Sequence, residues 1–229
     1  MNGLILFLGL FVAMGLSWYG IIFKNFTDFN RLQPQKLDVG GVYPAGRPGS
    51  ANAGQEVYKA NGCFACHTMQ VRMNGYGADI QRHWGKRNST LQDFLHDQNV
   101  FLGQVRVGPD LADVGTRFPD RETQLLHLYN PRITAKDSLM PQYRYLFTKE
   151  KIQGHADPRA LRLSGEFAPE AGYQVVPKPE AEALVSYLLS LHAQEPIFEA
   201  PIYPPAPKTN AVENAAPSTN NLPVAATPK

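Results

Sequence analysis

The stretch that decides the fold reads Cys63-Phe64-Ala65-Cys66-His67. It holds both cysteines of the 229-residue chain. Two thiols three positions apart, followed directly by a histidine, are the attachment signature of a c-type haem. Each thiol can form a thioether with one vinyl group of the porphyrin, and the histidine then lies beneath the iron as its proximal ligand. The motif therefore predicts one covalent haem c on Cys63 and Cys66, with His67 as an axial ligand of the iron.

Two other kinds of site use closely spaced cysteines, and both fit this sequence less well. A redox disulfide of the thioredoxin kind needs alternating strands and helices around the motif, and no such alternation surrounds it. A structural zinc site needs two further ligands at regular spacing, but there is no second cysteine pair and the other histidines are scattered.

The composition fits one ordinary domain with extensions. The chain is 43% apolar and 18% charged, with a net charge of +2. Because it has no dense stripe of Lys and Arg and no recognition motif, we expect no nucleic-acid partner.

An uncharged apolar run covers residues 3–23. As a helix rising about 1.5 Å per residue, it spans roughly 31 Å, enough to cross the hydrocarbon core of a membrane once. A cleaved signal peptide would have a basic residue before the run and a small-residue cleavage site close behind it. The nearest candidate site, Ala51-Asn52-Ala53, lies far downstream. We therefore expect a retained transmembrane anchor over residues 1–23.

Two signals for the orientation of this anchor disagree. Lys24, Arg31 and Lys36 follow the apolar run, and basic residues favour the cytoplasmic side. Thioether attachment of haem, however, takes place outside the bacterial cytoplasmic membrane. Since the haem motif is the stronger signal, we expect a single-pass protein of the bacterial cytoplasmic (inner) membrane with its haem domain on the periplasmic side.

Helical patterns flank the haem motif. A short helix begins at Ala53, carries Gly54 and Tyr58 on one face, and ends at Asn61-Gly62. A second, amphipathic helix is predicted over residues 180–192. Its apolar residues, at i, i+3, i+4 and i+7, are Leu184, Tyr187, Leu188 and Leu191.

A glycine on the first helix and an aromatic residue on the last permit the two helices to cross closely. This combination resembles class I cytochromes c, in which the terminal helices cross beside the haem. We therefore predict an all-α fold with four parts: the anchor, a Pro/Gly-rich tether (24–50), a mono-haem class I cytochrome c domain (51–194) and a Pro/Ala-rich tail (195–229), extended or disordered.

Residues 73–107 are rich in Gly, Asn, Gln and charged residues. A solvated basic face is the default interpretation, and the alternative is that some charges hold haem propionates or a partner's carboxylates. The charged residues considered are Arg72, Arg82, Lys86, Arg87 and Asp79.

The sixth iron ligand can be narrowed by elimination among five methionines. Met1 and Met14 belong to the anchor, and Met69 and Met73 follow His67 too closely to reach the opposite haem face. Met140, in a loop-like stretch before Pro141, remains. The alternatives, for an iron with two histidine ligands, are His83, His96, His127 and His155.

The sequence Val107-Gly108-Pro109-Asp110-Leu111 follows the basic segment. It resembles the stretch of class I cytochromes c in which a proline carbonyl accepts a hydrogen bond from the proximal histidine, a bond that fixes the ring and raises the ligand's basicity. Pro109 occupies the matching position, and Leu111 would pack on the porphyrin edge. An ordinary Gly-Pro turn is the alternative.

Several stretches together resemble one family, subunit II of cbb-type cytochrome c oxidases, the membrane-anchored mono-haem subunit of C-family haem-copper oxidases. The resemblance covers roughly residues 55 to 193. The stretches are 63–72 (CFACHTMQVR), 108–111 (GPDL), 114–118 (VGTRF), 127–132 (HLYNPR), 138–143 (SLMPQY) and 183–188 (ALVSYL).

The resemblance implies an electron-transfer subunit with no active site of its own. Such a subunit takes electrons from a dihaem cytochrome c subunit or a soluble cytochrome c and passes them to haem b of the catalytic haem-copper oxidase subunit. By position, Cys63, Cys66, His67 and Met140 would bind the haem. Arg132 would be a propionate partner, and His127 a structural residue.

Other functions share parts of this pattern. The haem c subunit of a nitric oxide reductase, or a free-standing membrane-anchored cytochrome c, has the same anchor and motif. A haem-based gas sensor would have a five-coordinate iron or a readily lost Met140, and a peroxidase needs an open distal site.

Overall fold

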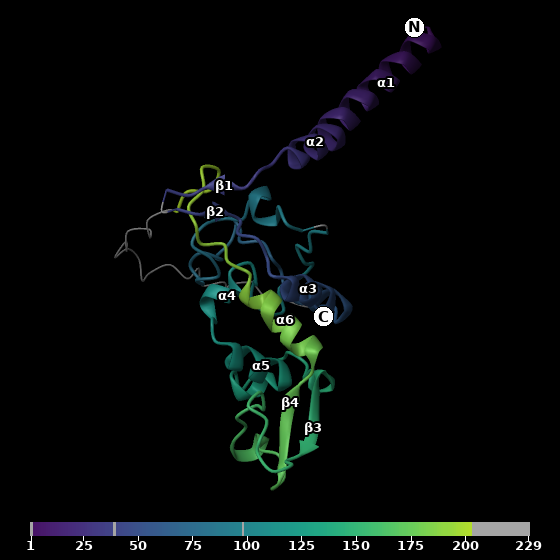
Figure 1. Cartoon of the computed structure of the whole chain (residues 1–229). Coiled ribbons are helices and arrows are strands. Elements are labelled where there is room, and N and C mark those ends of the chain that lie inside the picture. The colour runs from purple at the N-terminus through teal and green to yellow at the C-terminus, as the bar shows by residue number, and fades with distance from the viewer. Residues whose placement is uncertain (1, 39, 98, 203–229) are drawn as a thin grey trace, which may run out of the picture.

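The structure, a computed structural model, describes residues 2–38, 40–97 and 99–202. An N-terminal helix projects from a helix-rich domain, and a β hairpin forms the opposite end of the molecule (Figure 1). The helices are α1 (Gly3–Trp18), α2 (Lys24–Asn30), α3 (Gly49–Ala60), α4 (Val114–Arg117), α5 (Arg121–Tyr129) and α6 (Pro179–Leu189). Short 3-10 turns occur at Cys63–Ala65, Leu91–Phe94, Pro131–Ile133, Arg144–Leu146 and Gly165–Phe167.

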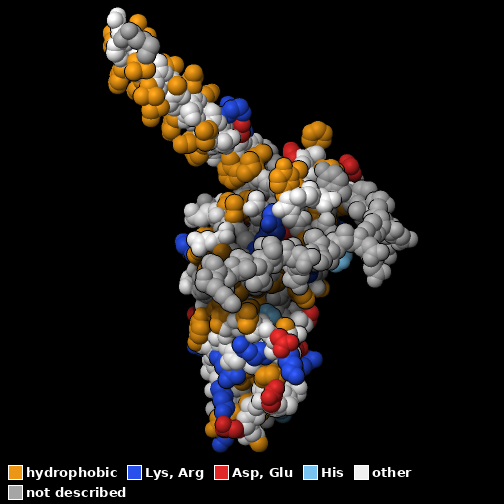
Figure 2. Space-filling model, turned by 180° about the vertical axis from the view of Figure 1, so that it is seen from behind, with side chains coloured by type: hydrophobic (Ala, Val, Ile, Leu, Met, Phe, Trp, Pro, Cys, Tyr) orange, Lys and Arg blue, Asp and Glu red, His pale blue; other side chains and the backbone are white. Residues whose placement is uncertain are grey.

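The N-terminal helix is long and apolar enough to cross a membrane. A π-helical turn, Tyr19–Phe23, joins α1 to α2, so that the helix runs without a break over Gly3–Asn30. It continues past the predicted end of the anchor, and there an ion pair between Lys24 and Asp28, one turn apart, adds modest support to the helix. Hydrophobic side chains cover its surface, with the first charges near the domain (Figure 2). This helix is compatible with a membrane anchor.

Helices α3 and α6 form the centre of the domain, where they lie side by side (Figure 1). Pro179 at the first position of α6 and the acidic side chains in its first turn favour the helix start. The buried face of α6 consists of Ala181, Leu184, Val185, Tyr187 and Leu188. The predicted crossing of the first and last helices of the domain is therefore present.

The expectation of an all-α fold needs a correction. Strand β3 (Phe147–Lys151) pairs antiparallel with β4 (Tyr173–Pro177), with Phe147 opposite Pro177 and Lys151 opposite Tyr173. Aromatic and β-branched residues in both segments favour strands over helix. The described part of the chain is thus helix-rich with a β hairpin, not wholly helical.

The segment predicted as a tether is attached to the domain. Strands β1 (Gln35–Lys36) and β2 (Val42–Tyr43) pair antiparallel, and the last described residues of the chain run beside them (Figure 1). Tyr43 is buried together with Ile197 and Ala200. The predicted Pro/Ala-rich tail is thus packed against the tether at its start, and from residue 203 onward it lies outside the described residues.

Candidate haem site

The haem motif begins where α3 ends. Gly62 has a positive φ of 65°, a conformation that glycine adopts without strain, and it turns the chain into the 3-10 turn Cys63–Ala65. In such a turn residues three apart lie on the same side. The local backbone therefore presents the thiols of Cys63 and Cys66 to one side. Both thiols are free, Cys63 half-buried and Cys66 exposed.

The surroundings of Cys63 suit an uncharged sulfur. Burial raises the pKa of its thiol to about 11. Cys63 packs against the main hydrophobic core, next to Phe64, whose ring lies 5.4 Å from that of Phe101. Since a thioether carries no charge, this apolar setting fits covalent attachment better than it fits a thiolate that binds metal or attacks a disulfide.

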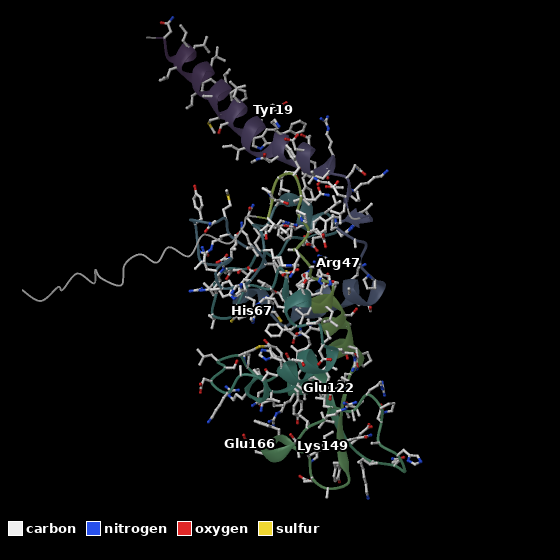
Figure 3. The ribbon with its side chains drawn as sticks, turned by 90° about the vertical axis from the view of Figure 1, so that its left-hand side faces the viewer. Tyr19, Arg47, His67, Glu122, Lys149 and Glu166 are labelled. Atoms are coloured by element: carbon white, nitrogen blue, oxygen red, sulfur yellow. The ribbon has the colours of Figure 1, made fainter. Side chains whose placement is uncertain are left out.

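One ring nitrogen of His67 forms a hydrogen bond, and the other has no hydrogen-bond partner among the described residues. Its Nδ1 lies 2.8 Å from the carbonyl oxygen of Pro109, to which it can donate. That bond fixes the tautomer in which Nε2 carries the lone pair needed to bind iron. Burial lowers the pKa of His67, which favours the neutral form that a metal requires. His67 lies midway along the domain, between the levels of Arg47 and Glu122 (Figure 3).

The backbone around Pro109 holds this geometry. Gly108 donates to the carbonyl of Cys66 at 3.0 Å, and Leu111 donates to that of Thr68 at 2.7 Å. A Cβ placed on Gly108 would lie 2.2 Å from Cε1 of His67. Only glycine therefore lets the chain pass so close to the imidazole ring.

The Met140 loop returns to the same core. Met140 is partly buried and packs against the main hydrophobic cluster, as Cys63 does. Tyr143 donates its backbone N–H to the carbonyl of Leu128 at 3.0 Å, which ties the loop to α5. Burial, and next the proximity of Cys63, raise the pKa of the Tyr143 hydroxyl to about 12. The loop that carries the predicted sixth ligand is thus adjacent to the haem motif.

The competing ligands are placed differently. Met69 is buried, and its sulfur accepts a hydrogen bond of 3.4 Å from the hydroxyl of Tyr187. His96 contacts the carbonyl of Pro44 at 3.2 Å, and His83 and His155 are exposed. His127 shares a hydrogen bond with Thr134. Burial, and then the nearby His67, lower the pKa of His127, so it is the alternative ligand that remains near the site.

Two further predicted site residues have different environments. Leu111 is 9% exposed and belongs to the main core cluster, against which Cys63 packs. Arg132 is exposed, in the short turn that follows α5, where its backbone N–H donates to the side chain of Asn130.

The default interpretation of residues 73–107 as a solvated face is wrong for its central charges. Arg87 and Asp79 are both 0% exposed, and each is paired with an opposite charge. Sequence reasoning also missed Asp110, which is fully buried and accepts a hydrogen bond from the hydroxyl of Thr68 at 2.6 Å. One feature of the sequence points to Asp110. It directly follows Pro109, whose carbonyl is predicted to accept a hydrogen bond from His67.

The residues fit a covalent haem: two thiols on one side of a turn, a neutral histidine with Nε2 open, and a glycine against its ring. A family model described as "Cytochrome C oxidase, mono-heme subunit/FixO" matches residues 48–165. The matched region includes the haem motif, the Pro109 turn and the Met140 loop. No match was found among curated proteins.

Proposed function

Because this chain belongs to the mono-haem subunit (FixO) family of the cytochrome c oxidases, we propose that it is the periplasmic electron-transfer subunit of a cbb-type oxidase. It receives single electrons from a dihaem cytochrome c subunit or a soluble cytochrome c. It passes them to haem b of the catalytic haem-copper oxidase subunit, where oxygen is reduced. The apolar helix Gly3–Asn30 anchors it as a single-pass protein in the bacterial cytoplasmic membrane.

The observation that carries this proposal is the contact of 2.8 Å between Nδ1 of His67 and the carbonyl oxygen of Pro109. This contact orients the imidazole and leaves Nε2 for the iron. Cys63 and Cys66 would hold the haem covalently, within a class I cytochrome c domain. The bound haem would supply a one-electron Fe(III)/Fe(II) couple.

Met140 is the proposed second axial ligand. Its loop is tied to α5 and packs against the same core as Cys63, which supports this assignment. A thioether ligand opposite an imidazole raises the reduction potential, as suits the oxidising end of a respiratory chain. Arg132, exposed in the short turn after α5, would be a propionate partner.

Purification of the chain with its bound partners tests the functional proposal. The full chain, tagged and purified in mild detergent, should show the pyridine haemochrome spectrum of one haem c and should bring down haem b and copper. Recovery with non-haem iron and no copper would instead identify a nitric oxide reductase subunit. Recovery alone with haem c would identify a free-standing carrier, and either result would overturn the proposal.

A pair of variants tests the axial ligand. Met140→Ala should abolish the weak long-wavelength band that a thioether ligand gives oxidised haem. The matched control is Met73→Ala, because Met73 is 50% exposed and also follows the haem motif. Retention of the band in Met140→Ala would show that another side chain, with His127 the nearest candidate, is the ligand.

A further inference from the structure

Four charged side chains form a network beside the residues that directly follow the haem motif. They are Arg72, Asp79, Arg106 and Asp110, and we call them the proximal charge network. Asp79 and Asp110 are 0% exposed, and the side chain of Arg106 is 17% exposed. Charges removed from water in this way interact strongly with one another and with nearby charged groups.

Asp110 connects the two chain segments that hold His67. Its Oδ2 accepts from the hydroxyl of Thr68 at 2.6 Å and from the backbone N–H of Gln70 at 2.8 Å. Its Oδ1 accepts from the backbone N–H of Ala112 at 2.9 Å. Thr68 follows His67 directly, so the carboxylate is fixed within a few bonds of the proposed iron ligand.

Arg106 lies between the two buried carboxylates. Its Nη1 donates to Oδ1 of Asp79 at 2.7 Å, and its Nη2 lies 3.6 Å from Oδ2 of Asp110. Its Nε donates to the hydroxyl of Thr68 at 2.8 Å, so the guanidinium also contacts the residue beside His67. The charge of Arg106 is therefore held in one place next to the proximal ligand.

Arg72 completes the network from the solvent side. It donates Nη2 to Oδ1 of Asp79 at 2.9 Å, and its side chain is 42% exposed. Burial alone would raise the pKa of Asp79, but hydrogen bonds from Arg72 and Arg106 lower it, so this carboxylate is ionised at neutral pH. The network holds two cations and two anions, so the loss of any one of them changes its net charge by one.

We propose that the proximal charge network sets the reduction potential of the haem through fixed charge, with Arg106 raising the potential and Asp79 lowering it. The ferric iron carries one positive charge more than the ferrous iron. A nearby cation therefore favours the reduced form, and a nearby anion favours the oxidised form. The inference rests on the proposed ligation of the iron by His67.

Redox titration of the purified full-length holoprotein tests this inference. Arg106→Gln should shift the midpoint potential downward, and Asp79→Asn should shift it upward, each by more than the error of the titration. The double variant should return towards the wild-type value. Arg106→Lys, which keeps the charge, should lie closer to wild type than Arg106→Gln does.

Arg82→Gln is the matched control. Arg82 and Arg106 contact the same ring, that of Trp84, at 5.0 and 5.5 Å from its centroid. Arg82 is exposed and lies outside the network, so its loss should leave the midpoint potential unchanged. A shift in Arg82→Gln as large as that in Arg106→Gln would overturn the inference, because proximity to the buried carboxylates would then not matter.

A purely structural role has a different signature. Loosening of the histidine loop would move the potential of Arg106→Gln and Asp79→Asn in the same direction and would alter the absorption spectrum of the oxidised haem. That result would overturn the inference.

If Arg106→Gln fails to accumulate, Arg72→Gln removes a more exposed cation of the same network and should also lower the midpoint potential. An unchanged or raised potential in Arg72→Gln would count against the inference. Absence of haem c from the wild-type protein would refute the proposed function itself.

Discussion

Gly54 on α3 lies against the backbone of Ala183 on α6. A Cβ placed on Gly54 would come within 1.9 Å of the Ala183 carbonyl oxygen and 2.7 Å of the Cβ of Tyr187. Two backbones can approach this closely only where one residue has no side chain. This contact fixes the distance between the two central helices.

Replacing Gly54 by Ala should therefore destabilise the domain. Because backbone atoms rather than a flexible side chain occupy the space, the helices must separate, at a cost of about 2–3 kcal/mol. Gly49→Ala is the control, since nothing lies within 4 Å of its Cβ position at the start of the same helix. Denaturant midpoints of the purified variants measure the difference, and equal midpoints would show that the crossing is loose.

Gly108 has a corresponding role beside His67. In Gly108→Ala the new methyl group would displace the imidazole, for which we expect a weaker hydrogen bond to Pro109 and a loss of stability of about 1–3 kcal/mol. The haem should stay attached through its thioethers, while its spin state or ligand-field spectrum changes. Gly46→Ala, with nothing near its Cβ position, should retain the wild-type spectrum. An unchanged spectrum in Gly108→Ala would contradict the assignment of His67.

The Arg87–Asp93 pair connects the tether to the last described residues. Arg87 donates to Oδ1 of Asp93 at 2.7 Å and to the backbone carbonyl of Glu195 at 2.6 Å. Tyr43, from β2, donates its hydroxyl to the same carboxylate at 2.5 Å and lies under the guanidinium. One buried cation thus holds three segments that are distant in the sequence.

Arg87→Met should lower the free energy of unfolding by about 3–5 kcal/mol, because it leaves the Asp93 carboxylate without its cation. It should also make the tether more sensitive to limited proteolysis. The control is Arg159→Met, which removes the exposed pair with Asp157 and should change stability by less than about 1 kcal/mol. Similar decreases in the free energy of unfolding of the two variants would mean that the buried Arg87–Asp93 pair stabilises the fold no more than an exposed pair does.

The lowered pKa of Asp79 predicts that the free energy of unfolding depends on pH. Although burial opposes ionisation, hydrogen bonds from Arg72 and Arg106 hold the pKa of Asp79 below its usual value. As the pH falls, the Asp79 carboxylate is therefore protonated near pH 4 in the unfolded state but only at a lower pH in the folded state. The stability that Asp79 contributes is therefore complete above about pH 4 and is lost as the pH falls through the lowered pKa.

Denaturant midpoints measured from about pH 7 to about pH 3 check this prediction. Wild type should be more stable than Asp79→Asn at neutral pH, and the difference should shrink as the pH falls below about 4. A difference that stays constant with pH would show that the Asp79 carboxylate is not ionised in the folded protein.

The sequence by itself determined the parts of the protein that depend on local spacing. A haem motif, a charge-free apolar run and an i, i+3, i+4 pattern are each readable within about twenty residues. They predicted the apolar N-terminal helix and the crossing of the first and last domain helices. The family was predicted from the resemblance of several longer stretches, such as 127–132 and 138–143. The haem motif assigned Cys63, Cys66 and His67 to the haem, and elimination among the methionines assigned Met140. These four assignments remain predictions.

Only the tertiary structure decided which charges are buried and what the flanking segments contact. Arg87 reaches the carbonyl of Glu195, 108 positions away, and Arg106 meets Asp79 from 27 positions away. No local pattern distinguishes these side chains from solvated neighbours such as Arg82. The hairpin of β3 and β4 was missed for a related reason, because its strands pair across a long loop. Burial and pairing of this kind depend on contacts between distant segments, which exist only once the chain has folded.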